Sequence, residues 1–103
     1  MKIFFIADIH GNQFALKRIL EYAGDINSDA IFCAGDMSGY FTGINEVVEL
    51  LQAYQLKSLL GNHDAFLLDM LPVNPEKGYY SSYVKSREII STTSLNWLTG
   101  LNE

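Results

Sequence analysis

The chain has 103 residues, a length that allows one compact domain with a modest core. Hydrophobic residues make up 49% of the composition and charged residues 18%, which is typical of a globular protein and excludes a disordered or fibrous one. The net charge of −5 argues against long nucleic acid as a partner, because proteins that bind a phosphate backbone collect basic residues on one face.

Cysteine content and hydropathy bear on the location of the protein. The single cysteine, Cys33, excludes an intramolecular disulfide framework, and the first residues lack the apolar region and cleavage site of a signal peptide. No apolar run approaches the roughly 20 residues needed to cross a bilayer, so no membrane partner is expected. We therefore expect a cytoplasmic protein.

The first 60 residues alternate between strand and helix patterns. Strands are expected over 3–7, 30–34 and 56–60, and helices over 13–23 and 44–51. The first strand should be covered on both faces because its apolar run is nearly continuous, and Gly24 should end the first helix. This alternation predicts the α/β class, with a mainly parallel sheet flanked by helices.

The rest of the chain is expected to be helical and to cover the sheet. Helices are expected over 65–71, 83–90 and 95–101, with a loop over 73–82. Pro72 should close the first of these helices and Ser94 should cap the last.

Two groups of apolar and aromatic residues in this region have both a structural and a functional interpretation. The aromatic group is Tyr79, Tyr80, Tyr83 and Trp97, and the apolar group is Leu67, Leu68, Met70 and Leu71. The aromatic residues could stack on a nucleotide base and the apolar residues could form a partner groove. Core packing is the interpretation we favour for both groups.

Each predicted strand is followed by side chains that bind metals or transfer protons. They are Asp8 and His10 after the first strand, Asp36 after the second, and Asn62, His63 and Asp64 after the third. Ligands bind at the carboxyl ends of the strands in an open parallel sheet, so these side chains are expected to meet there.

Four of these residues have the chemistry of metal ligands. Asp8 and His10 are two positions apart, so an extended backbone would direct both side chains toward one cation. Asp36 has two carboxylate oxygens and could bridge two ions roughly 3.5 to 4 Å apart, while Asn62 adds a neutral oxygen. Oxygen and nitrogen donors together favour manganese, iron or zinc.

His63 and Asp64 are the candidate catalytic pair. The unperturbed pKa of a histidine, about 6.5, would let His63 donate a proton to a leaving alkoxide, with Asp64 orienting its ring. Taken alone, each of these residues is more often an ordinary turn, cap or loop residue. Their joint placement after three successive strands favours a metal site.

At these residues the chain resembles the calcineurin-like metallophosphoesterases. Asp8-Ile9-His10, Gly35-Asp36 and Gly61-Asn62-His63-Asp64 are similar, in order and spacing, to the first three motifs of that family. The segment that begins at Gly35-Asp36 looks more like the small bacterial phosphodiesterase branch than the Ser/Thr protein phosphatases. The resemblance is strong over 1–64 and fainter up to residue 101.

The resemblance implies a sandwich of two sheets flanked by helices, of which residues 1–103 would form one incomplete, N-terminal portion. It also implies hydrolysis of phosphomonoesters or phosphodiesters, including nucleotides, by a metal-activated hydroxide. Asp8 and His10 would then serve the first metal, manganese by preference, while Asp36 bridges and Asn62 serves the second. His63 would be the acid.

The same family closes its metal centre with further histidines from a C-terminal half, and the sequence has only His10 and His63. The second metal site should therefore be weakened, and the activity of the chain by itself low or absent. Self-association or a second chain could complete the fold. The alternative is a non-catalytic binding or regulatory remnant of the same fold.

Overall fold

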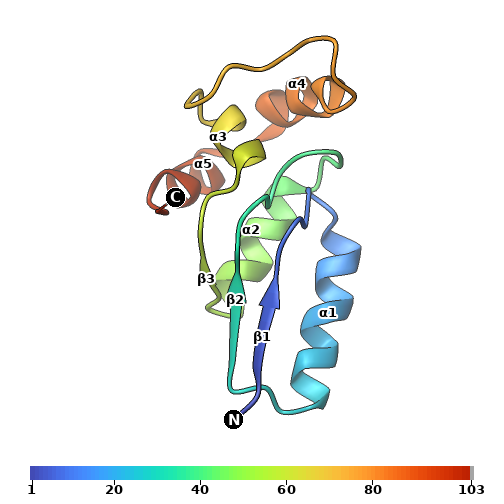
Figure 1. Ribbon diagram of the computed structural model, residues 1–103, viewed down its shortest axis with the longest axis vertical. Helices are drawn as coiled ribbons and strands as arrows, with labels where there is room; N and C mark the ends of the chain where they lie inside the picture. Colours follow the sequence, from blue (N-terminus) through green and yellow to red (C-terminus); the bar gives the residue numbers. More distant parts are fainter. Residues whose placement is uncertain (103) are drawn as a thin grey trace.

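The computed structural model describes residues 1–102, in which a three-stranded parallel sheet and five helices follow one another (Figure 1). The elements are β1 (Ile3–Ile6), α1 (Gln13–Asp25), β2 (Ala30–Cys33), α2 (Ile44–Ala53), β3 (Lys57–Ser58), α3 (Asn62–Leu67), α4 (Tyr80–Ile89) and α5 (Thr92–Thr99). The predicted α/β class with a parallel sheet and flanking helices is confirmed.

Helices α1 and α2 pack together on one face of the sheet (Figure 1). The strand order β1-β2-β3 advances in one direction, and right-handed connections then place successive helices on the same side. The core between the layers includes Leu16 and Leu20 of α1, Val47 and Leu51 of α2, and Ile6 and Ile31 of the strands.

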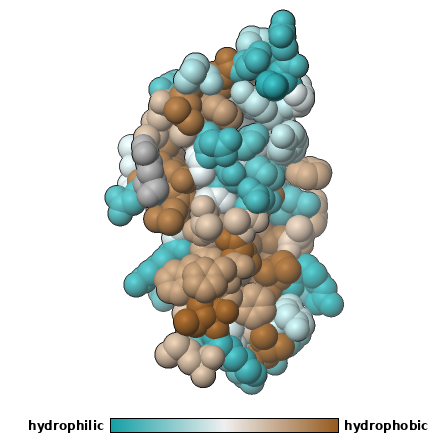
Figure 2. All heavy atoms as spheres, viewed as in Figure 1, coloured by the Kyte–Doolittle hydropathy of each residue, from teal (hydrophilic) through white to brown (hydrophobic). Residues whose placement is uncertain are grey.

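The other face of the sheet is open. The parallel register pairs Phe5 with Phe32 on this face, where their rings stack with centroids 5.5 Å apart. Phe5 is 74% exposed and Ile3 44% exposed. Figure 2 shows hydrophobic side chains gathered over this part of the molecule. The prediction that β1 is covered on both faces is therefore wrong, because both connecting helices lie on the opposite side.

The C-terminal helices pack against the end of this core. Leu98 of α5 is fully buried, and Tyr83 and Trp97 pack against the same cluster, so the packing interpretation of these two aromatic residues is confirmed. The side chain of Asn45 in α2 binds the segment between α4 and α5. Its amide N–H donates to the carbonyl of Ile89 at 2.9 Å, and its Oδ1 accepts from the backbone N–H of Ser91 at 2.9 Å.

Packing also explains most of the apolar group after β3. Leu67 is buried and Leu68 packs against the core. Met70 and Leu71 are 47% and 45% exposed, so the core interpretation is wrong for these two residues. Since α3 already ends at Leu67, they lie in the loop beyond it.

Several predicted helix boundaries differ from the observed ones. Helix α1 continues through Gly24, and the turn falls instead at Asn27, which has a positive φ of 54°. Helix α4 begins at Tyr80, three residues earlier than expected. Helix α5 is capped by Ser91, whose hydroxyl accepts from the backbone N–H of Ser94 at 3.0 Å.

Helix α3 also begins earlier than predicted, at Asn62. The reason is a local cap: the Asp64 carboxylate accepts the backbone N–H of Gly61 at 3.0 Å, which satisfies a donor that precedes the first turn. His63 consequently lies in the first turn of a helix. Within residues 1–102, no helix combines the length and apolar character needed to cross a bilayer.

Candidate metal centre

The loops that follow β1 and β2 run side by side and are joined through their backbones. The N–H of His10 donates to the carbonyl of Asp36 at 2.9 Å, and the N–H of Gly11 donates to that of Met37 at 2.6 Å. Asp8, His10 and Asp36 all have positive φ angles, of 57°, 51° and 58°. This conformation costs a residue with a side chain of order 1–2 kcal/mol and is typical of functional sites.

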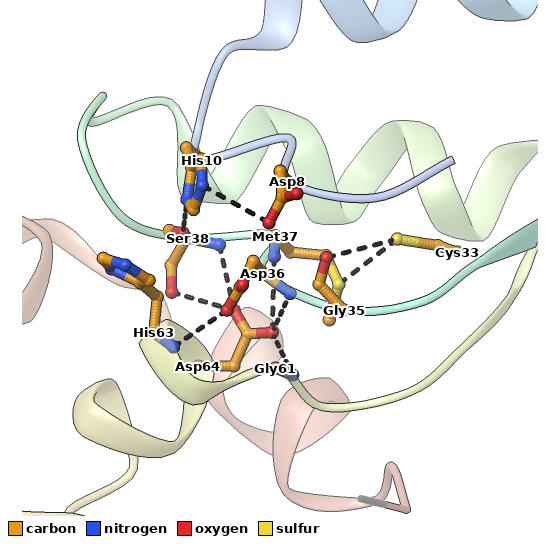
Figure 3. Close-up of polar contacts among 10 residues, drawn as sticks. All are labelled: Asp8, His10, Cys33, Gly35, Asp36, Met37, Ser38, Gly61, His63 and Asp64. Carbon is orange, nitrogen blue, oxygen red and sulfur yellow. Dashed lines mark hydrogen bonds and ion pairs between the residues drawn. The ribbon is translucent and has the colours of Figure 1, made fainter. Parts of the chain in front are cut away.

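These turns bring three predicted ligands together. Donor atoms of Asp8, His10 and Asp36 all lie within 4.8 Å of one another. The Nε2 atom of His10 is 3.6 Å from Oδ1 of Asp8. Figure 3 shows His10 directed at Asp8, with Asp36 next to them. The prediction that an extended segment pairs Asp8 with His10 is wrong, because left-handed backbone turns at both residues produce this arrangement.

The imidazole of His10 is oriented by a hydrogen bond on its far side. Its Nδ1 donates to the carbonyl of Ser38 at 2.9 Å, which leaves the Nε2 lone pair free for a cation. Ser38 is itself buried, and its hydroxyl donates to the Asp64 carboxylate at 2.8 Å. Sequence reasoning missed Ser38, since a serine two positions after Asp36 carries no signal of this role.

Asp64 is fully buried beneath the centre. Its Oδ2 accepts the backbone N–H groups of Asp36 at 2.9 Å and Gly61 at 3.0 Å, and its Oδ1 accepts that of Ser38 at 2.9 Å. In residues 1–102 no hydrogen bond joins this carboxylate to the ring of His63, which was the contact expected from the sequence. Its oxygens hold the loop after β2 instead.

Asp36 lies between the two flanking loops, as its central role in the prediction requires. Its Oδ1 accepts the backbone N–H of His63 at 2.9 Å, and burial together with the neighbouring carboxyl of Asp8 raises the pKa of Asp36. A Cβ atom at Gly61 would overlap the Asp36 side chain, so only glycine allows α3 to approach this closely. Burial is the largest cause of the raised pKa, and the neighbouring Asp8 and Asp64 carboxylates add to it.

His63 lies among aromatic rings. Its ring centroid is 4.8 Å from that of His10, 5.2 Å from those of Tyr40 and Tyr79, and 5.5 Å from that of Phe66. Burial lowers the pKa of His63. Tyr79 also stacks on Phe66, which agrees with its interpretation as a packing residue. The positions of Tyr40 and Phe66 had no signal in the sequence.

Asn62 is exposed in the first turn of α3, next to His63. Its amide makes no hydrogen bond to the other described residues, and its role as a metal ligand stays a prediction. Two carboxylates and one imidazole with a free Nε2 form a donor set suited to a divalent ion such as manganese, iron or zinc.

The cluster of Asp8, His10 and Asp36 lies at the carboxyl ends of parallel strands. The chain is therefore an α/β protein with a candidate metal centre at that edge of its sheet. The sequence pattern of the calcineurin-like phosphoesterases matches residues 1–101. The chain belongs to the calcineurin-like phosphoesterase family.

Relatives of known sequence are considerably longer than this chain. The protein MJ0912 of Methanocaldococcus jannaschii is 32% identical over 101 residues, which cover 93% of this chain and 40% of that protein. A symmetrical bis(5′-nucleosyl)-tetraphosphatase of Buchnera aphidicola is 28% identical over 105 residues, which cover 95% of this chain and 37% of that protein. The chain thus spans about 40% of the length of these relatives.

Two solved structures have a similar fold over the length of this chain. A metallophosphoesterase from Sphaerobacter thermophilus superimposes with a TM-score of 0.73 at 29% identity, covering 98% of this chain and 41% of the other. A putative diadenosine tetraphosphatase superimposes with a TM-score of 0.74 at 29% identity, covering 96% and 42%. The fold therefore matches part of a metallophosphoesterase structure.

Proposed function

We propose that the chain carries the N-terminal part of a metal-dependent phosphoesterase centre. The observation that carries this proposal is the convergence of Asp8, His10 and Asp36, with the Nε2 atom of His10 left free by its hydrogen bond to Ser38. Family membership supports it. Three protein donors with open positions around them are typical of a catalytic rather than a structural metal site.

Each side chain has a role in this proposal. Asp8 and His10 would hold a first cation, Asp36 would be shared with a second, and Asn62 would add an oxygen ligand for the second. Divalent cations bound there, manganese by preference, supply positive charge that neutralises phosphoryl oxygens and activates water. His63 holds the proton that goes to the leaving oxygen, and Asp64 is a positioning residue that fixes the loop bearing Asp36 and Ser38.

The proposed substrate is a small phosphoester or a nucleotide. Two relatives are named for diadenosine tetraphosphate or bis(5′-nucleosyl) tetraphosphate hydrolysis, which supports a nucleotide. The net charge of −5 disfavours long nucleic acid. The cytoplasmic location expected from the single cysteine stays a prediction.

The second cation site is the weaker of the two in this proposal. Asp36 and Asn62 are its only proposed ligands, and both histidines of the sequence already have other roles. Ligands from outside residues 1–103 would complete the centre. A non-catalytic binding remnant is the second candidate, and the shortage of imidazoles is the observation that favours it.

Manganese binding and turnover together test the proposal. We expect the purified chain to bind Mn²⁺ by calorimetry and metal analysis, and Asp36→Asn to weaken that binding at least about tenfold. Asparagine tolerates the positive φ of this position, so the variant keeps its backbone. The control is Asp25→Asn at the exposed end of α1.

Hydrolysis of bis(4-nitrophenyl) phosphate with Mn²⁺ then separates the two candidates. Two bound Mn²⁺ ions with turnover that disappears in Asp36→Asn support the enzyme, and one bound ion without turnover supports the binding remnant. Equal Mn²⁺ affinity in the wild type and Asp36→Asn, or no Mn²⁺ binding by either, would contradict both.

A further inference from the structure

Tyr40 has a fixed position beside the candidate metal centre. It lies four residues after Asp36, in the loop that follows β2. The next residue, Phe41, donates its N–H to the carbonyl of His10 at 2.8 Å, and Gly43 donates to that of Gly11 at 2.9 Å. These bonds continue the backbone pairing between the two loops, so the base of the Tyr40 side chain is held in place.

The ring of Tyr40 contacts both imidazoles of the site. It meets His10 edge-on, with centroids 5.1 Å apart and planes at 83°, and it is tilted by 49° against His63 at 5.2 Å. Nevertheless Tyr40 is 55% exposed. A ring that served only to pack the two histidines would bury most of its surface, whereas more than half of Tyr40 is available to another molecule.

A cavity extends from the metal ligands past this ring. It has a volume of about 590 Å³, within the range of about 300 to 1,000 Å³ of small-molecule sites. Asp8 and His10 line it at the metal centre, while Tyr40, Phe41 and Ile19 supply apolar surface. Phe41 is also 55% exposed. Polar ligands at one end and aromatic surface beyond them suit a molecule with an anionic head and a flat apolar body.

We propose that Tyr40 is a specificity-determining residue that stacks on the aromatic group of a phosphate ester bound at Asp8, His10 and Asp36. The ligand class is an aryl phosphate or a nucleotide, which share a flat ring within reach of a phosphate. This proposal rests on the proposed function, since the phosphate is placed by the metal centre. Stacking of a base on an aromatic side chain changes affinity by about tenfold.

Two phosphonates that differ only in the ring test this role by calorimetry of the Mn²⁺-loaded chain. Their P–C bond is not hydrolysed as a phosphate ester is, so binding is measured without turnover. We expect phenylphosphonate to bind about tenfold more tightly than methylphosphonate, and Tyr40→Ser to reduce this ratio to about two or less. Tyr40→Phe should keep the ratio. The matched control is Tyr54→Ser, at the exposed far end of α2.

A second pair of ligands, adenosine 5′-monophosphate and ribose 5-phosphate, distinguishes the two sources of the ring. If Tyr40→Ser reduces the affinity ratio more for this pair, the cavity binds a nucleobase. If it reduces the ratio more for the phosphonate pair, the cavity binds an aryl group. Equal binding within both pairs in the wild type, or ratios unchanged by Tyr40→Ser, would overturn the role of Tyr40 and leave the metal centre standing. If no ligand binds with Mn²⁺, the proposed function fails and Tyr40 has no phosphate ester to recognise.

Discussion

The buried Asp64 carboxylate joins segments that are distant in the sequence. It accepts hydrogen bonds from the backbone of Asp36, Met37 and Ser38 after β2 and from Gly61 before α3. These hydrogen bonds satisfy backbone N–H groups that would otherwise be buried without partners. The geometry of Asp36 and Ser38 therefore depends on Asp64.

We expect Asp64→Asn to lower the free energy of unfolding by about 2–4 kcal/mol. The amide removes the negative charge and directs an NH₂ group at backbone donors that have no other acceptor. Urea unfolding followed by circular dichroism measures the change, with Asp25→Asn as a surface control that should stay within about 0.5 kcal/mol. Equal stability of Asp64→Asn and the wild type would show that these hydrogen bonds contribute little.

At the scale of the elements, the length of α1 is set by contacts at its ends. Asn12 caps its first turn by accepting the N–H of Ala15 at 3.1 Å, and the positive φ of Asn27 makes the turn toward β2. Gly24 lies inside the helix, and a Cβ atom there would meet nothing within 4 Å. A glycine in this position increases the backbone entropy of the unfolded chain, and neither close packing nor a positive φ requires it in the folded one.

Gly24→Ala should therefore raise the free energy of unfolding by about 0.5–1 kcal/mol. Gly35→Ala is the matched contrast. Gly35 has a φ of 113°, and a Cβ atom there would lie 2.6 Å from the backbone N of Gly61, so this variant should lose stability. Thermal and urea unfolding of both variants provide the measurement. A stabilising Gly35→Ala, or a destabilising Gly24→Ala, would contradict this account.

On the scale of the whole molecule, the open face of the sheet is the dominant surface feature. Ile3, Phe5 and Leu59 are exposed on it, at 44%, 74% and 46%, and Phe32 lies between them. Exposed apolar surface over a sheet favours association.

We expect the purified chain to self-associate in a concentration-dependent way, and Phe5→Lys to shift it toward the monomer. Phe5 is so exposed that the substitution should cost little stability. Light scattering coupled to size-exclusion chromatography measures the mass, with Phe14→Lys as the control, since Phe14 is 76% exposed on α1 away from this face. A monodisperse wild-type monomer at all concentrations would contradict the prediction.

Local patterns were enough to predict the order of strands and helices, the parallel sheet and the family. Apolar runs and helical spacing depend on near neighbours in the chain, and the motifs around Asp8, Asp36 and His63 are themselves short. These residues follow successive strands, and parallel strands end at the same edge of a sheet. Their convergence at that edge could therefore also be predicted.

Contacts between residues far apart in the sequence determined the covered face of the sheet and the geometry of the site. Which face of the sheet is covered follows from strand order and connection handedness, and a continuous apolar run does not contain that information. The free Nε2 of His10 depends on Ser38, 28 positions away, and the hydrogen bonds of Asp64 reach back 26 to 28 positions. The place of Tyr40 beside the imidazoles of His10 and His63 has the same origin, since these rings meet only when the two loops pair.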